Sequence, residues 1–292
     1  MQSREIVVSV SCLTYNHAPY IRQCLDGFMM QKTDFAFEVL IHDDASTDGT
    51  AEIIKEYEAR YPDVIKPIYE DENQWVKGRR GSAVFNFPRA RGMYIALCEG
   101  DDYWMDPLKL QKQVTFLEKN KTYSMCGHNC VIYLESTSVF KNYEIGISGT
   151  YTLNDIVTRN VYCPTLSVLF RRSAIMDEVF SKYKMMVDMS LAYHLLKYGL
   201  GYCLSDKMAV YRVHKGGVWS GVSENKQLLF NLNTRMSICE VERDDLSSIF
   251  LANYIKSIGR LWQLKHIGKI TKSFFYVLRQ LGVRRTCAIF SR

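Results

Sequence analysis

Three carboxylates follow directly after an apolar run near the middle of this 292-residue chain. The run covers residues 93–98, and Glu99, Asp101 and Asp102 come immediately after it. Carboxylates this close repel one another unless a positive group lies among them. Residues i and i+2 of an extended segment point to the same side, so Glu99 and Asp101 can reach one ion. We therefore predict a site for Mn²⁺ or Mg²⁺ that also carries phosphate oxygens, the alternative being an acid-rich surface turn.

Polar residues also end two earlier apolar runs. Residues 14–17, Thr-Tyr-Asn-His, follow the first run, and Asp43 and Asp44 follow the second. A carboxylate of this doublet can accept a hydrogen bond from a base N–H or a ribose hydroxyl, and we predict this for one of the two. The alternative is helix capping, for which Asp48 also qualifies. Further on, Lys77 and four arginines between residues 71 and 91 either form a solvated basic face or meet phosphate oxygens.

Two single residues later in the chain could complete a site. Asp188 stands at the start of an expected helix, where a lone Asp is more often a cap than a catalyst. His214 follows a short apolar segment and precedes a glycine-rich loop. With a metal expected nearby, it becomes a candidate ligand. Residues 126–130, Cys-Gly-His-Asn-Cys, lack a second cluster at zinc spacing, so we assign them to the core.

The elements that must position these residues alternate between strands and helices. Strands are expected at residues 6–13, 37–41, 64–69 and 93–98, with helices at 20–30 and 50–61 between them. This alternation predicts a parallel sheet with right-handed crossovers, in which ligands bind at the carboxyl ends of the strands. Further elements are expected as a helix from Pro107 to residue 120, strands at 123–134, 165–170 and 210–213, helices at 173–180 and 186–198, and helix from residue 224 onward.

The net charge of +6 is concentrated in a C-terminal basic segment. Residues 246–292 carry nine Lys or Arg and no acid, so +9 in this segment leaves −3 for the rest. The segment is amphipathic, which predicts a helix packed on the domain or one lying on an anionic inner membrane.

The nine cysteines are scattered along the chain, which fits reduced thiols better than a disulfide framework. With no apolar run near the ~20 residues of a spanning helix and no signal-peptide pattern, we expect a cytoplasmic protein, peripheral on the membrane if the segment binds it.

Together these motifs resemble glycosyltransferase family 2. The resemblance covers residues 5 to about 220 and rests on the order and spacing of Thr14-Tyr15-Asn16, the stretch 43–50, Glu99-Gly100-Asp101-Asp102, Asp188 and Tyr211-Arg212-Val213-His214. Members of this family are inverting, metal-dependent enzymes, and the chain looks most like bacterial enzymes that build capsular or lipopolysaccharide chains. The resemblance implies an α/β protein of the GT-A fold, with a Rossmann-like, mostly parallel sheet flanked by helices. It also implies a catalytic domain over residues 1–220 and a helical, basic region over 221–292.

The resemblance gives each matching residue a role. Asp101 and His214 would hold Mn²⁺ or Mg²⁺, and Asp188 would be the general base. Many members have Asp where this chain has Glu99. The donor would be a nucleotide sugar, most simply a UDP-sugar. The acceptor would be a glycan or lipid-linked hydroxyl, and no nucleic acid partner is expected. In the donor site, Thr14, Tyr15 and Asn16 would lie beside the base, and Asp44 would bind it. Glu99 would face the ribose, and Lys77 would contact the phosphates. Asp101 and Asp102 would complete the donor site.

Other functions fit the motifs less well. A nucleotidyltransferase usually carries a glycine-rich basic loop after the first strand, where this chain has Thr-Tyr-Asn-His-Ala. A dinucleotide-dependent oxidoreductase would have G-x-G-x-x-G at that place. A nucleotide- or sugar-binding protein of the same fold without transfer activity is a further alternative. The joint presence of Asp101, Asp188 and His214 favours the enzyme.

Overall fold

The structure is a computed structural model that describes residues 5–79, 81–143, 145–183, 187–217, 219, 221–258, 271, 273, 275–277 and 279–280. Its strands are β1 (Ile6–Thr14), β2 (Ala36–Asp43), β3 (Ile65–Tyr69), β4 (Tyr94–Leu97), β5 (Tyr103–Trp104), β6 (Tyr123–Leu134), β7 (Val139–Tyr143), β8 (Gly149–Tyr151), β9 (Leu169–Arg171) and β10 (Leu200–Val213). Its helices are α1 (Ile21–Met29), α2 (Thr50–Arg60), α3 (Ser82–Phe85), α4 (Lys109–Lys119), α5 (Leu153–Arg159), α6 (Asp188–Leu195), α7 (Glu224–Glu242) and α8 (Asp245–Ile258).

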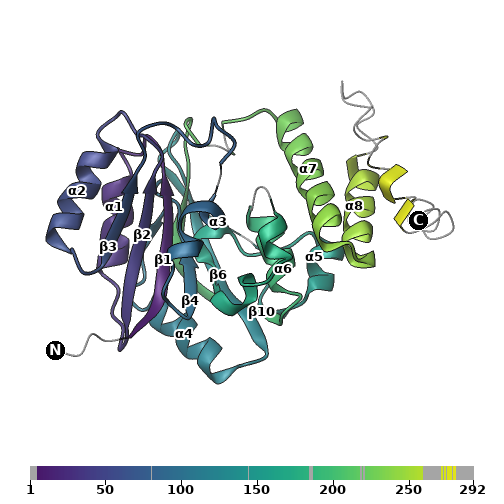
Figure 1. The fold of residues 1–292 in the computed structure, drawn as a ribbon, viewed down its shortest axis with the longest axis horizontal. Helices are drawn as coiled ribbons and strands as arrows, with labels where there is room; N and C mark the ends of the chain where they lie inside the picture. The colour runs from purple at the N-terminus through teal and green to yellow at the C-terminus, as the bar shows by residue number, and fades with distance from the viewer. Residues whose placement is uncertain are drawn as a thin grey trace.

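The strands form one ten-stranded sheet in the order β3-β2-β1-β4-β9-β6-β10-β5, with β7 on β6 and β8 on β10 (Figure 1). The first four strands in this order are parallel, as expected, and Val10 of β1 lies opposite Val39 and Ala96 of its two neighbours. Beyond β4 the sheet is mixed, because β9 runs antiparallel to both β4 and β6. The α/β class is therefore confirmed, with a mixed sheet in place of a mostly parallel one.

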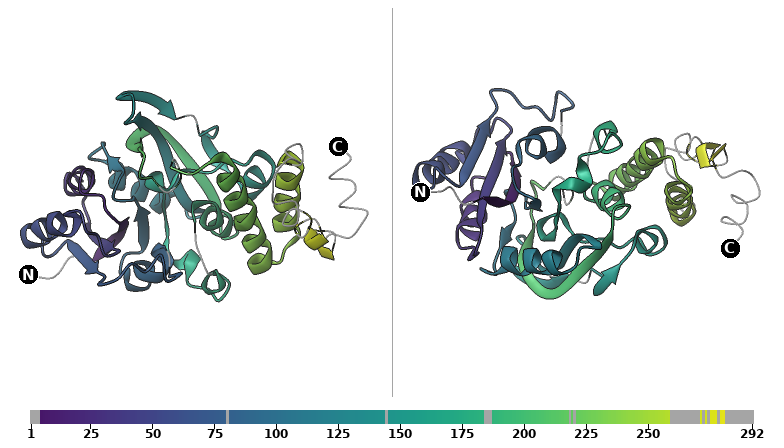
Figure 2. Two further views of the ribbon diagram at one scale, coloured as in Figure 1. Left: turned by 90° about the horizontal axis from the view of Figure 1, so that it is seen from above. Right: turned by 60° about the horizontal axis from the view of Figure 1, so that its bottom comes forward.

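Three expected elements differ from those in the structure. Residues 173–180, expected as a helix, contain only short 3₁₀ turns at Arg172–Ile175 and Phe180–Lys182. The strand expected at 165–170 begins as the 3₁₀ turn Thr165–Ser167. The strand expected at 210–213 is the end of β10, which is long and curved (Figure 2). Its exposed polar middle interrupts the alternation, and its pairing with β6 shifts register there.

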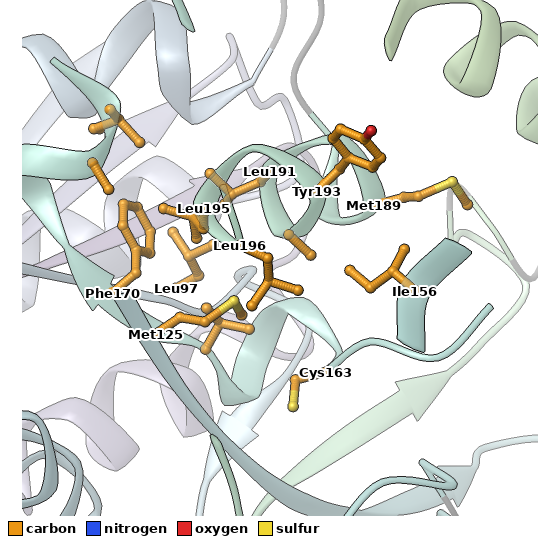
Figure 3. Packing of buried hydrophobic residues seen from close by; sticks show 14 of the residues in the cluster. Leu97, Met125, Ile156, Cys163, Phe170, Met189, Leu191, Tyr193, Leu195 and Leu196 are labelled. Atoms are coloured by element: carbon orange, nitrogen blue, oxygen red, sulfur yellow. The ribbon is translucent and has the colours of Figure 1, made fainter. Parts of the chain in front are cut away.

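Helices cover both faces of the sheet because strand residues alternate between two buried clusters. On β4, Tyr94 and Ala96 join a cluster that α1, α2 and α4 cover, whereas Ile95 and Leu97 join one built with α5 and α6. Figure 3 shows this second cluster, in which Leu97 and Met125 of the sheet pack beside Leu191 and Leu195 of α6. The sheet therefore supports α6 directly, and Asp188 is the first residue of that helix.

The C-terminal helices pack on the rest of the molecule. Helix α7 contacts α6 and helix α8 contacts α5, and α7 and α8 share a small cluster that includes Leu232 and Leu251. Most of the basic amphipathic segment lies outside the described residues, so its membrane role stays a prediction. Among the helices that the structure describes, none combines the length and apolar character needed to cross a bilayer.

Candidate active site

The loop that carries the three carboxylates is fixed to the end of β1 by backbone hydrogen bonds. Cys98 N donates to Ser11 O at 3.2 Å, and Gly100 N donates to Leu13 O at 2.9 Å. A Cβ at position 100 would lie 2.9 Å from the Thr14 hydroxyl oxygen, so this close approach requires glycine. The loop therefore has one position relative to the sheet, and it holds Glu99 and Asp101 at the carboxyl end of the parallel strands.

Asp101 lies between two histidines. Its Oδ2 is 3.1 Å from Nε2 of His214 and 3.8 Å from Nε2 of His17, and the His214 ring packs 4.6 Å from that of Tyr20. Burial alone would raise the pKa of Asp101, but the hydrogen bond with His214 holds it below its usual value. The carboxylate is thus ionised at neutral pH, and the two residues expected to share a metal ion lie within hydrogen-bond distance of each other.

The residues around Asp101 fit a divalent cation that takes part of its ligands from a substrate. Among the residues that the structure describes, no group of three or more His, Cys, Asp or Glu is placed to hold a metal ion alone. Mg²⁺ commonly uses one or two carboxylates together with waters and phosphate oxygens, a set that Asp101 can begin. Beside it, two buried polar atoms, Thr14 Oγ1 and His17 Nδ1, have no hydrogen-bond partner among the described residues. Unsatisfied buried atoms of this kind suit a site that is completed by a ligand.

Glu99 and Asp188 approach each other from different elements. Burial and the charges of Asp101 and Asp188 raise the pKa of Glu99 to about 8. Oδ1 of Asp188 accepts a hydrogen bond from Met189 N at 2.8 Å, and the half-buried side chain borders a small internal cavity together with Cys163 and Thr165. Burial raises the pKa of Asp188, which makes its carboxylate a stronger base than an exposed one.

Helix α6, which presents Asp188, is held from α7 by one buried carboxylate. Glu242 accepts hydrogen bonds from Tyr183 at 2.9 Å and Lys197 at 2.6 Å, and its Oε1 lies 2.8 Å from Nδ1 of His194. Burial alone would raise the pKa of Glu242, but these three partners hold it below its usual value. The position of Asp188 therefore depends on a helix that begins about 35 residues after it in the sequence.

The residues expected at the nucleotide base lie in two loops that bind each other. Asn16 Oδ1 accepts from Thr47 N at 2.8 Å, so this side chain joins the loop after β1 to the loop after β2. Thr14 is buried, whereas Tyr15 is 46% exposed on the rim. Asp44 accepts from the backbone N–H of residues 74 and 75 and orders the loop 71–79. Each of its oxygens keeps a second lone pair for a base N–H.

Two other expected donor contacts have partners within the protein. Asp102 is buried, and its Oδ1 accepts from Arg212 N at 2.7 Å. The Arg212 guanidinium in turn donates to the Asp101 carbonyl oxygen and to Gln23. Lys77 pairs with Glu72 at 2.7 Å on the exposed part of the 71–79 loop. The structure thus brings Glu99, Asp101, Asp188 and His214 together, whereas Asp102 ties the loop to β10.

Sequence reasoning assigned no role to two residues of this site. His17 directly follows the Thr-Tyr-Asn motif, and its place at the end of β1 was the available signal. Arg212 lies in the Tyr-Arg-Val-His motif that ends at His214. The alternation of buried and half-buried side chains along this end of β10 was the corresponding signal. Neither signal was strong, because both residues contact the 99–102 loop, which is remote from each of them in the sequence.

Comparison with known proteins gives the same family as the motifs. The family model described as Glycosyl transferase family 2 matches residues 9–180. An uncharacterized protein of Mycobacterium tuberculosis (strain H37Rv) is 39% identical over 213 residues, which is 73% of this chain and 60% of that protein. The chain therefore spans about three fifths of the length of this relative.

Two further proteins extend the comparison. The Escherichia coli UDP-Glc:alpha-D-GlcNAc-diphosphoundecaprenol beta-1,3-glucosyltransferase WfaP is 27% identical over 240 residues, 80% of this chain and 86% of WfaP. The crystal structure of Staphylococcus aureus TarS 1–349 with UDP-GlcNAc superposes with a TM-score of 0.69 at 18% identity, covering 97% of this chain and 84% of TarS. This likeness confirms the expected GT-A fold. The chain belongs to glycosyltransferase family 2.

Proposed function

We propose that this chain transfers a sugar from a UDP-sugar to a hydroxyl group of a glycan or lipid-linked acceptor in cell-surface polysaccharide biosynthesis. The observation that carries the proposal is the convergence of Asp101, His214 and Glu99 at one sheet edge, with Asp188 close enough to act on Glu99 electrostatically. Family membership supports sugar transfer. The UDP-GlcNAc bound by TarS supports a UDP donor, and the diphosphoundecaprenol in the name of WfaP supports a lipid-linked acceptor.

The donor is held on the side of the 99–102 loop. Asp101 and His214 are the residues that would hold Mn²⁺ or Mg²⁺, which when bound supplies positive charge for the diphosphate leaving group. Asp44 accepts a hydrogen bond from the base, with Thr14, Tyr15 and Asn16 beside it. Glu99 faces the ribose side. Lys77 would reach the phosphates only after leaving Glu72, with which it pairs on the exposed loop.

The chemical step is a single displacement at the anomeric carbon. The acceptor oxygen forms a bond to this carbon as the bond to the diphosphate oxygen breaks, and UDP leaves with that electron pair. Asp188 takes the proton of the attacking hydroxyl, whose own pKa lies far above 7. Attack from the face opposite the leaving group inverts the anomeric configuration. Burial raises the pKa of Asp188 and so strengthens it as the general base.

A screen of nucleotide sugars tests this proposal. Thermal unfolding is measured with UDP-, GDP- and dTDP-sugars, each with Mn²⁺, with Mg²⁺ and with a chelator. A ligand at 100 times its Kd stabilises a protein by about 2.7 kcal/mol, which is a readily measured shift. We expect stabilisation by UDP-sugars and its loss with the chelator. Stabilisation by GDP-sugars alone, or by no nucleotide, would contradict the proposal.

Peripheral binding of the basic segment 246–292 to an anionic membrane belongs to the same proposal, since lipid-linked acceptors are membrane-bound. Helix α8 packs on α5 and α7, so a test by truncation before it would disturb the fold. The sharper variant keeps the full chain and replaces Lys265, Lys269 and Lys272 by Gln. Flotation with anionic vesicles should decrease in this variant, because each basic residue contributes about 1 kcal/mol near such a surface. Equal flotation of both proteins would contradict membrane binding through this segment.

A further inference from the structure

His17 is held beside the 99–102 loop by its own backbone. Its N–H donates to Thr50 Oγ1, at the first residue of α2, at 2.8 Å. Its carbonyl oxygen accepts from the N–H groups of Tyr20 and Ile21 at the start of α1, both at 2.8 Å. These bonds join the loop after β1 to two helices. The imidazole ring therefore starts from a fixed position, and a ligand does not have to order it on binding.

One edge of this ring faces the glycine of the carboxylate loop. A Cβ at Gly100 would lie 3.0 Å from His17 Nδ1 and 2.9 Å from Thr14 Oγ1, so both atoms face the same point. Both are buried, and neither has a hydrogen-bond partner among the described residues. A buried N–H without an acceptor is rare, whereas a lone pair here can accept from the Thr14 hydroxyl or from a water. The hydrogen of the neutral ring is therefore assigned to Nε2, which also carries one in the protonated ring.

The other edge of the ring lies near Asp101 without binding it. His17 Nε2 is 3.8 Å from Asp101 Oδ2, which is longer than a hydrogen bond, and the same oxygen is 3.1 Å from Nε2 of His214. Within the described part of the chain, His17 Nε2 donates to no other group. The side chain is 17% exposed, so a ligand can reach this edge. The ring thus presents a hydrogen-bond donor beside the residue proposed to hold the cation.

An oxygen of a diphosphate is the acceptor that suits this donor. Asp101 is negatively charged, so an anion approaches it only together with a cation. Phosphate oxygens that share an ion with Asp101 lie beside its carboxylate, and this brings them within reach of His17 Nε2. A hydrogen bond to a charged oxygen is about twice as strong as one between neutral groups. The imidazole does not compete for the ion, because the nitrogen on that side carries the hydrogen.

We propose that His17 Nε2–H donates a hydrogen bond to a diphosphate oxygen of the bound UDP-sugar. The diphosphate gains negative charge as its bond to the anomeric carbon breaks. A fixed donor at this place stabilises that charge without any movement of the protein. The hydrogen stays on the imidazole, and the phosphate oxygen keeps its electron pair. This inference rests on the proposed function and adds His17 to the residues that hold the leaving group.

The test measures nucleotide affinity of the full chain by calorimetry, with Mn²⁺ and separately with Mg²⁺. His17→Ala removes the donor and should lower UDP affinity about 10- to 100-fold with either ion, the usual loss for a hydrogen bond to a charged group. Affinity for uridine, which has no phosphate, should stay within twofold by ligand-detected NMR. His17→Gln places an amide N–H near the position of Nε2 and should recover part of the UDP affinity, whereas the shorter His17→Asn should not.

A matched control separates this contact from a general effect on the region. Arg22→Ala removes another donor close in sequence, one that pairs with Glu56 at 2.7 Å on the surface, and should bind UDP like wild type. Thermal unfolding of each variant without ligand checks that the fold is retained.

Three results would overturn the inference while wild-type protein still binds UDP. The first is equal UDP affinity in His17→Ala and wild type. The second is an equal loss of UDP and uridine affinity, which would give His17 a purely structural role. The third is a loss with Mn²⁺ and not with Mg²⁺, which would make His17 a metal ligand, since imidazole binds transition-metal ions in preference to Mg²⁺. Absence of UDP binding to wild-type protein would instead overturn the proposed function, and this inference with it.

Discussion

The two sides of the candidate site are supported in different ways. The 99–102 loop is fixed by backbone hydrogen bonds to β1 and by Arg212, so the sheet itself positions Asp101. Asp188 instead begins a helix whose apolar side chains pack on the sheet and which Glu242 joins to α7. The proposed leaving-group side thus depends on hydrogen bonds to the loop backbone, and the proposed base side depends on side-chain packing and on a buried polar network. Substitutions on the two sides should therefore have separable effects on nucleotide binding, on transfer and on stability.

The largest effect is expected from Asp101→Ala, which removes the central carboxylate of the leaving-group side. Metal-dependent UDP binding and transfer should both fall below detection, because His214 would lose its carboxylate partner and the cation its charged ligand. Calorimetry with UDP and Mn²⁺ measures the binding. Asp63→Ala, an exposed carboxylate away from the loop, is the control and should bind UDP like wild type. Wild-type UDP affinity in Asp101→Ala would remove this residue from the donor site.

Asp188→Asn changes the base side alone. The amide cannot accept the proton of the acceptor hydroxyl, so the transfer rate should fall about 10²- to 10⁴-fold, the usual contribution of general base catalysis. UDP affinity should remain within twofold of wild type. Initial rates of UDP release and calorimetry on the same sample measure the two quantities. If UDP affinity falls as far as in Asp101→Ala, the two sides are not separate and the assigned roles are wrong.

Glu242→Gln tests the support of the base side. Removing a buried charge that binds His194 and Lys197 should lower the free energy of unfolding by about 2–3 kcal/mol, a value reduced for the partial exposure of Lys197. UDP affinity should be retained, because none of the hydrogen bonds that Glu242 makes within the described part of the chain reaches the 99–102 loop. Chemical denaturation measures the loss, with the exposed neighbour Glu240→Gln as the control on the same helix. Equal stability of the two variants would show that α6 has other support.

The last expected effect is a pH dependence of the free energy of unfolding, caused by a buried lysine beside Trp104. Lys109 is fully buried, with Nζ 2.8 Å from Gln113 Oε1 and 4.0 Å from the centroid of the Trp104 ring, and burial lowers its pKa to about 7 from 10.5. Between these values the unfolded chain binds a proton that the folded chain does not. The free energy of unfolding should therefore rise with pH across this window, by about 1 kcal/mol per unit.

The variant Lys109→Met provides the reference for this measurement. Its methionine does not titrate, so the difference between wild type and variant isolates the contribution of Lys109 from that of other groups. Urea denaturation at pH 7, 8 and 9 gives the two slopes. Parallel slopes would show that Lys109 keeps its proton in the folded state and is therefore a buried positive charge beside the Trp104 ring.

The sequence predicted the two regions unequally, for physical reasons. Strands β1, β2 and β4 are short apolar runs that end in polar residues, and their periodicity alone placed the motifs at one edge. The middle of β10 contains exposed Ser205, Asp206 and Lys207, which hide a strand from any periodicity argument. Residues 173–180 have a helical pattern, but tertiary packing of Ala174, Ile175 and Phe180 turns them into 3₁₀ segments.

The candidate site shows the same division. The pairing of Asp101 with His214 followed from motifs whose strands end at one edge. The neighbourhood of His17 and Asp101 and the support of α6 by Glu242 depend on contacts between residues that are remote in the chain, and no local pattern encodes them. The roles assigned to all the site residues stay predictions, and Asp44, Asp102 and Lys77 have their present partners within the protein.

One feature of β10 has a kinetic consequence. Arg212 donates from the end of β10 to the Asp101 carbonyl oxygen and to Gln23 of α1, so one guanidinium joins β10, the 99–102 loop and α1. Because the loop is already held by this contact and by β1, a nucleotide does not have to reshape it on binding. UDP should therefore associate in a single step. In stopped-flow experiments the observed rate of UDP binding would then rise in proportion to the UDP concentration, without a plateau.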